Sequence, residues 1–266
     1  MTYIAAPDRY DAMAYRACGS SGLRLPVLSM GLWHNFSDAT PMHTQREIAL
    51  TAFDLGITHF DLDTPLEETM GALATAVRQG KALYVGISSY SATKTREAAA
   101  ILRAEGVPLL IHQPSYNLFN RWVEPDLLDA LGELGVGMIA FTALAQGLLT
   151  DKYLDGIPAD ARINRPGGDS FQREMLSQAN LTRVRALNDI AQRRGQSLAQ
   201  MAYAWVLRDP RVTTTLMGAS SAAQVRENVG TLANMAFSTE ELAEIDRYAV
   251  ESGVNLWQKP STDQRV

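Results

Sequence analysis

The sequence predicts an α/β protein built from parallel βαβ units. Short apolar segments typical of strands alternate with longer segments typical of helices, separated by brief polar stretches. The chain has 266 residues, and a single (β/α) barrel occupies about 250. No internal repeat, low-complexity stretch or interdomain linker interrupts the pattern, so we expect one domain over residues 1–266.

The first part of the chain begins with a predicted hairpin at about residues 14–28, where the glycine-containing segment 19–22 separates two short apolar runs. The elements expected next are a strand at 27–33, a helix at 44–55, a strand at 57–62 and a helix at 64–80. Gly56 ends the first of these helices, and Thr64 forms a capping box with Glu67 at the start of the second.

The remainder of the chain continues the alternation. The strands expected there are 82–88, 108–113, 137–142 and 213–217, and the helices are about 92–105, 124–134, 179–194, 197–208, 221–233 and 239–250. Capping boxes at Ser197 with Gln200 and at Ser238 with Glu241 start two of these helices. The pattern holds six strands, not eight, so a six-stranded doubly wound sheet stays open beside a barrel.

Composition excludes several classes of protein. The net charge of −5 argues against a nucleic-acid or anionic-membrane partner. Cys18 is the one cysteine, so an internal disulfide is impossible and a reducing, cytoplasmic location is expected. We find neither a leader pattern at the first residues nor a run of about 18 apolar residues, so we expect no membrane segment.

The strongest local signal is the segment 216–228, where a strand ends at Gly218 and a helix follows with Ser221 as its cap and Gln224 three residues later. Free backbone N–H groups and the positive end of a helix favour an anion, and small residues allow a phosphate to approach. Taken alone, the segment is more typical of an ordinary capped helix, because capping boxes are common.

In context, this segment resembles the nucleotide-binding motif of the aldo-keto reductases, in the form shared with potassium-channel β subunits. Five further segments match that family in order, at the ends of successive strands. They are 31–33, 56–61, 86–89, 112–117 and 139–150. The last two are most similar to the bacterial L-glyceraldehyde 3-phosphate reductase branch.

The resemblance implies a (β/α)8 TIM barrel whose strand ends bind NADP(H). Ser88 and Gln113 match positions that bind the nicotinamide carboxamide, and Phe141 matches the aromatic residue that stacks on the ring. The remaining positions implied for the cofactor are Gly31, Trp33, Thr142, Leu144, Gly147, Lys152, Gly218, Ser220, Gln224, Glu227 and Asn228. Among these, Thr142, Leu144 and Gly147 match the pyrophosphate loop, and the last four match the adenosine end.

Two positions depart from the family pattern. Ala143 stands where close relatives carry proline, which predicts a less rigid pyrophosphate loop. Ser221 stands where the closest branch has arginine, so Arg226, Arg162 or Arg165 would have to bind a 2′-phosphate. We expect NADPH in preference to NADH.

The catalytic centre implied by the family is incomplete here. Family members donate a proton from a tyrosine whose pKa is lowered by a lysine and an aspartate, and a histidine orients the carbonyl. Asp61 matches the aspartate, but Leu62 is followed directly by Asp63, where the family has strands 3 and 4. About two βα units are absent after strand 2, either because the deletion is real or because this sequence omits them.

Two functions follow from the resemblance. The first is reduction of small aldehydes or ketones, such as glyceraldehyde 3-phosphate or methylglyoxal, with Trp33, His34 and Tyr116 expected to contact the substrate. The second is a catalytically inactive nucleotide-binding or regulatory protein similar to a channel β subunit. The exposed edges of an incomplete barrel would favour a homo-oligomer.

Overall fold

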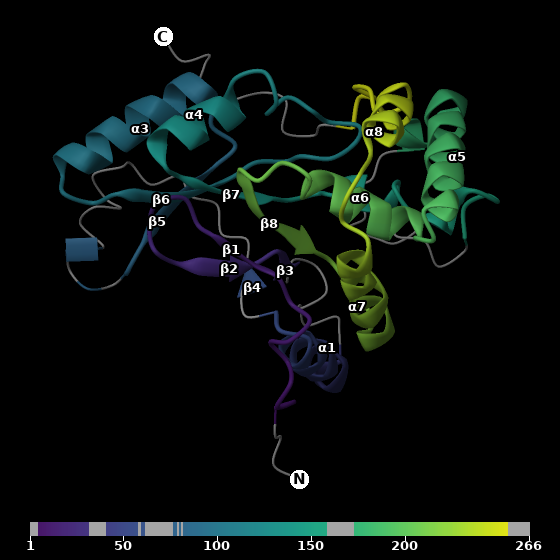
Figure 1. Ribbon diagram of the computed structural model, residues 1–266, viewed down its shortest axis with the longest axis horizontal. Coiled ribbons are helices and arrows are strands. Elements are labelled where there is room, and N and C mark those ends of the chain that lie inside the picture. Colours follow the sequence, from purple (N-terminus) through teal and green to yellow (C-terminus); the bar gives the residue numbers. More distant parts are fainter. Residues whose placement is uncertain are drawn as a thin grey trace.

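The computed structural model describes residues 5–31, 41–57, 60–61, 77–78, 80, 82–158 and 173–254 (Figure 1). Its centre is a six-stranded sheet in the order β4-β3-β8-β7-β6-β5. The strands are β3 (Leu28–Gly31), β4 (Phe60–Asp61), β5 (Val85–Ser88), β6 (Leu109–Gln113), β7 (Gly137–Ala140) and β8 (Val212–Met217). All five pairings are parallel.

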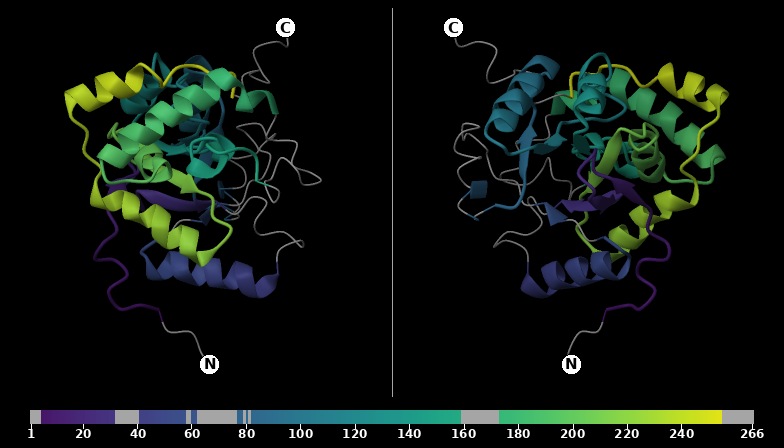
Figure 2. Two further views of the ribbon diagram at one scale, coloured as in Figure 1. Left: turned by 90° about the vertical axis from the view of Figure 1, so that its right-hand side faces the viewer. Right: turned by 60° about the vertical axis from the view of Figure 1, so that its left-hand side comes forward.

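Helices follow the strands, as βαβ units require. They are α1 (Met42–Asp54), α3 (Ala92–Ala104), α4 (Leu127–Leu134), α5 (Gln178–Arg193), α6 (Leu198–Val206), α7 (Ala222–Val229) and α8 (Thr239–Asp246). Short 3-10 helices lie at η1 (Ala145–Gly147), η2 (Asp151–Tyr153), η4 (Arg173–Leu176) and η5 (Gly230–Ala233). Two pairs lie side by side, α3 with α4 and α1 with α7 (Figures 1 and 2).

The strand order is that of a barrel opened at one place. The first strand of the sheet, β3, pairs with the last, β8, which is the pairing that closes a (β/α)8 barrel. A doubly wound sheet in the order 3-2-1-4-5-6 would instead pair its first strand with its fourth and leave its last strand at an edge. The break falls between β4 and β5, which lie at opposite edges, so the two missing units belong after the second strand of the barrel.

The predicted hairpin is confirmed as β1 (Tyr15–Ala17) and β2 (Arg24–Pro26), which pair antiparallel. It packs against the amino-terminal ends of the strands. The guanidinium of Arg16 donates to the carbonyl of Val212 at 2.8 Å, and Cys18 Sγ contacts the carbonyl of Leu110 at 3.7 Å. A Cβ on Gly137 would lie 2.6 Å from that sulfur, so only glycine fits there. The opposite, carboxyl-terminal ends of the strands are left for a site.

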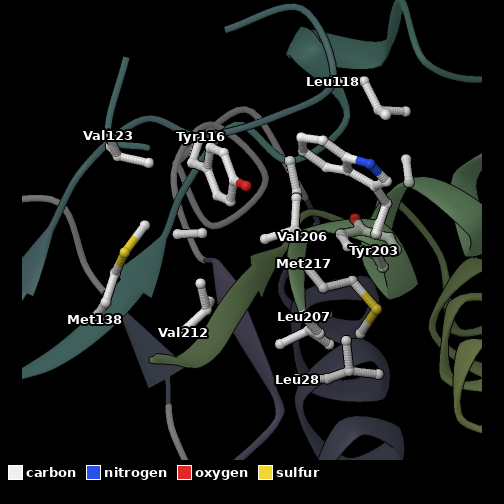
Figure 3. Packing of buried hydrophobic residues seen from close by; sticks show 14 of the residues in the cluster. Leu28, Tyr116, Leu118, Val123, Met138, Tyr203, Val206, Leu207, Val212 and Met217 are labelled. Carbon is white, nitrogen blue, oxygen red and sulfur yellow. The ribbon is translucent and has the colours of Figure 1, made fainter. Parts of the chain in front are cut away.

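The hydrophobic core lies between the sheet and its helices. Helix α6 is buried along its whole length, and Figure 3 shows its Tyr203 and Val206 beside Met217 of β8. Leu28 of β3 and Leu207, just beyond α6, complete this contact. Because every face of α6 is largely apolar, the start of this helix was indicated by the capping box at Ser197 and not by hydrophobic periodicity.

Most predicted elements are confirmed within a few residues, including both capping boxes in the second half of the chain. The strand predicted at 137–142 ends earlier, because Thr142 adopts a left-handed φ of 57°. The capping box at Thr64 and most of the helix predicted at 64–80 lie outside the described residues. Among described residues, no helix is long and apolar enough to cross a membrane.

Candidate active site at the carboxyl ends of the strands

The site residues predicted at strand ends lie along one edge of the sheet. Gly31 pairs with Asp61 in register, Ser88 pairs with Gln113, and Phe141 forms an isolated parallel bridge with Ser115. Parallel strands place all their carboxyl ends on the same side, which is where (β/α) barrels carry their active sites. The fold therefore brings together segments up to about 190 residues apart in sequence, from β3 to α7.

The end of β5 is hydrogen-bonded to the end of β6. The hydroxyl of Ser88 donates to the carbonyl of Gln113 at 2.8 Å, and the amide of Ser89 donates to the same oxygen at 3.2 Å. Ser89 has a left-handed φ of 58°, which is uncommon for a residue other than glycine. The Ser88 side chain is exposed and Gln113 is half-buried, so both are accessible at the strand ends.

The loops after β6 and β7 are joined by a set of polar side chains. The hydroxyls of Ser115 and Thr142 lie 2.6 Å apart, and the Asn117 side chain donates to the Thr142 carbonyl at 2.9 Å. Asn120, fully buried, donates to the Ser115 hydroxyl at 3.0 Å. Sequence reasoning missed these residues as a group, because a partner 27 positions away gives no local signal.

The loop after β7 is strained. Thr142, Ala145 and Gln146 all have positive φ, at 57°, 45° and 60°. Each such residue costs of order 1–3 kcal/mol, and such conformations cluster at ligand sites. Thr142 is the most unusual of the three because its side chain is β-branched. Its hydroxyl also donates to the Phe141 carbonyl at 2.7 Å, so the conformation is held by several contacts.

The turn from β8 into α7 is the capped helix start that the sequence predicts. Ser221 caps the helix, and its side chain accepts from the amide of Gln224 at 3.3 Å. The side-chain oxygen of Gln224 turns back to accept from both the amide and the hydroxyl of Ser220, at 2.7 and 2.9 Å. Asn228 is buried, whereas Glu227 is exposed and its carbonyl accepts from Gln200 of α6 at 2.7 Å.

These loops contain polar atoms without partners and glycines with open space beside them. Both side-chain polar atoms of Gln146 are buried without a partner, an arrangement that a bound ligand would satisfy. Cβ atoms added to Gly147 or Gly218 would meet nothing within 4 Å, so space is open at both loops. Lys152 is exposed on η2, which Thr150 caps, and it can reach toward a phosphate from solvent.

Tyr116 does not lie where it was predicted. Its side chain is 0% exposed, and its hydroxyl donates to Glu124 at 2.6 Å while accepting from Arg208 at 2.7 Å. The ring packs against Trp205 with a centroid distance of 5.3 Å. The expectation that Tyr116 contacts substrate is corrected, because no part of its side chain is open to one.

The charged groups around Tyr116 stabilise one another. Burial raises the pKa of Glu124, but hydrogen bonds from Arg121, Tyr116 and Arg208 outweigh it, and the net pKa lies below the usual value. Burial also raises the pKa of the Tyr116 hydroxyl, so this phenol is poorly suited to release a proton. The cluster joins the loop after β6 to α6 and is structural.

Two of the predicted substrate positions, Trp33 and His34, lie outside the described residues. Asp61 is placed by its backbone at the end of β4. Within the described ranges, no group of three histidine, cysteine or acidic side chains is arranged to hold a metal ion.

Comparison with known proteins shows to which family this chain belongs. The model of the aldo/keto reductase family matches residues 61–250. The chain belongs to the aldo/keto reductase family. Members of this family generally use nicotinamide cofactors and reduce aldehydes, and their fold is the (β/α)8 barrel, of which the described residues hold six strands.

Relatives from both expected branches are found. The chain is 45% identical to the L-glyceraldehyde 3-phosphate reductase of Escherichia coli strain K12, covering 98% of this chain and 99% of the relative. It is 35% identical to a probable voltage-gated potassium channel subunit beta of Oryza sativa, covering 72% of this chain and 60% of that protein. The corresponding Arabidopsis thaliana protein is 36% identical, over 64% of this chain and 52% of that protein.

The bacterial alignment also measures what this chain lacks. It spans 344 positions, whereas the chain has 266 residues, so at least 344 minus 266, or 78, positions have no counterpart here. At about 30 residues for each βα unit of a 250-residue barrel, 78 residues correspond to two units and a loop. β4 and β5, between which such units would fall, are the two edge strands of this sheet.

Proposed function

We propose that this chain binds NADPH along the carboxyl ends of β5 to β8 and that its reaction is the reduction of small aldehydes or ketones, such as glyceraldehyde 3-phosphate or methylglyoxal. The observation that carries the proposal is the strained loop after β7, in which Thr142, Ala145 and Gln146 have positive φ. This loop belongs to a chain of the aldo/keto reductase family. Strain of this kind is retained where a ligand uses it.

The cofactor would lie across four strand ends. Ser220, Gln224, Glu227 and Asn228, in and before α7, would hold its adenosine portion, with Gly218 leaving room for a phosphate. The exposed Arg226 on the same helix is available to a 2′-phosphate, which supports NADPH over NADH.

The loop after β7 would hold the middle of the cofactor, through Thr142, Leu144 and Gly147 with Lys152 nearby. Phe141 would stack on the nicotinamide ring, and Ser88 with Gln113 would bind the carboxamide. Bound NADPH supplies a hydride to the carbonyl carbon, and this chain's residues orient the ring that carries it.

A second candidate is cofactor binding without turnover, and the open sheet favours it. β4 and β5 lie at opposite edges, and the segment that would follow Asp61 in the family, with its proton-donating tyrosine and the lysine and histidine of strands 3 and 4, is absent. The described lysines are Lys94, on α3, and Lys152, on η2, so neither ends a strand. Asp61 alone cannot donate the proton that carbonyl reduction requires at neutral pH.

An assay of NADPH oxidation separates the two candidates. The purified chain is given NADPH with methylglyoxal or glyceraldehyde 3-phosphate, and absorbance at the nicotinamide band is followed beside a binding titration. Aldehyde-dependent oxidation supports the reductase. Binding without oxidation supports the second candidate, and a folded chain that binds no NADPH contradicts both.

A further inference from the structure

His112 occupies an unusual position for a polar residue. It lies on β6 directly before Gln113 and is 0% exposed. Successive side chains of a strand point to opposite faces, so the imidazole and the Gln113 side chain lie on opposite sides of the sheet. The imidazole cannot therefore touch a ligand bound where Gln113 points.

Among the described residues, the imidazole makes one hydrogen bond. Its Nε2 accepts from the backbone amide of Tyr90 at 3.0 Å, and its Nδ1 is buried without a partner. Burial lowers the pKa of His112 to about 3, so the ring is neutral and carries its proton on Nδ1. An apolar residue would avoid the unsatisfied nitrogen, so the benefit of histidine here lies in the contact with Tyr90.

That contact fixes the turn between β5 and α3. Four residues make the turn, from Ser88 at the end of the strand to Ser91, whose side chain caps α3 by accepting from Lys94. The Gln113 carbonyl binds the Ser88 hydroxyl and the Ser89 amide, and His112 binds the next amide, that of Tyr90. Two neighbouring residues of β6 thus hold three successive residues of the turn.

We propose that His112 is a positioning residue for the nicotinamide end of the cofactor. By holding the Tyr90 amide it keeps Ser89 in its left-handed conformation, and this aims the Ser88 hydroxyl beside Gln113. The inference rests on the proposed function, in which Ser88 and Gln113 bind the carboxamide. It predicts that His112 affects recognition of nicotinamide and leaves recognition of the adenosine portion unchanged.

A pair of matched variants tests this proposal. In His112→Gln the side-chain oxygen reaches the place of Nε2 and can accept from Tyr90, whereas in His112→Asn it reaches only the place of Nδ1. Both substitutions are neutral and polar, so they differ mainly in reach. The two ligands are NADPH and 2′-phospho-ADP-ribose, which is the same molecule without the nicotinamide, and the measurement is the Kd of each by calorimetric titration.

We expect His112→Asn to raise the Kd for NADPH by about tenfold, because the hydrogen bond that orients the turn is lost. The Kd for 2′-phospho-ADP-ribose should stay unchanged. His112→Gln should bind both ligands nearly as the wild type does. An unchanged Kd for NADPH in His112→Asn, or an equal loss for both ligands, overturns the positioning role. A wild-type chain that binds neither ligand contradicts the proposed function itself, which is a distinct result.

Discussion

The hydroxyl groups of Ser115 and Thr142 lie 2.6 Å apart and connect the loop after β6 to the loop after β7. Ser115 also accepts from the buried side chain of Asn120, and its carbonyl accepts from the indole of Trp122 at 2.8 Å. The strained conformation of Thr142 therefore depends on a partner from a different strand end.

Replacing Ser115 by alanine should weaken both the fold and the site. The change removes one acceptor of the buried Asn120 side chain, and we expect a loss of about 1–3 kcal/mol in the free energy of unfolding. The Kd for NADPH should rise several-fold, because Thr142 loses a support. Ser177→Ala is the control: Ser177 caps α5, and its loss should cost about 1 kcal/mol with no change in NADPH binding. Equal NADPH affinity in both variants would count against the loop as a cofactor site.

Tyr116→Phe should affect stability and not the substrate. The change removes a buried hydroxyl that bonds Glu124 and Arg208, so the free energy of unfolding should fall by about 1.5–3 kcal/mol in urea denaturation. Cofactor Kd should stay as in the wild type. A variant of unchanged stability that shows an altered KM for aldehyde would restore Tyr116 as a substrate contact.

The buried imidazole of His112 should make stability depend on pH between about 6.5 and 3. Its pKa in the folded chain, about 3, lies below the ordinary 6.5, so only the unfolded chain takes up a proton in that range. The contribution of His112 to the free energy of unfolding is therefore fully present above about pH 6.5. It falls by about 1 kcal/mol for each pH unit as the pH is lowered. His112→Gln should remove this part of the decline, measured as the difference in unfolding free energy between pH 7 and pH 5. Parallel declines in variant and wild type would mean that His112 is not buried as a neutral group.

Gly218 offers a test of cofactor placement that should leave the fold intact. Its φ lies outside the left-handed range and a Cβ there meets no atom within 4 Å, so Gly218→Ala is expected to fold with wild-type stability. If a phosphate approaches this turn, the added side chain should raise the Kd for NADPH at least tenfold. The matched control is Gly132→Ala on α4, which should stabilise the helix by about 1 kcal/mol and bind NADPH normally. Normal NADPH binding by Gly218→Ala would place the cofactor elsewhere.

Sequence reasoning predicted the elements of the sheet and its missing part well. Apolar alternation and capping boxes are local signals, and the hairpin, the strands and the boxes at Ser197 and Ser238 were confirmed for that reason. The position of the break could be predicted because the family motifs before and after Leu62 belong to distant parts of a barrel.

What the sequence could not predict depends on distant partners. Tyr116 was expected at the mouth because it follows a strand end, yet Arg208, 92 positions away, holds its hydroxyl in the core. His112 gave no signal, since its partner is a backbone amide of another strand's loop. The left-handed conformation of Thr142 also could not be predicted, because a β-branched residue is the last one that sequence rules would place there.

A titration of NADPH into the purified 266-residue chain, with the 29.1 kDa mass first verified on the same sample, tests the central claim most directly. We predict saturable binding of one NADPH per chain, because every loop assigned to the cofactor lies outside the missing segment. A folded chain of that mass that shows no saturable binding would contradict the account.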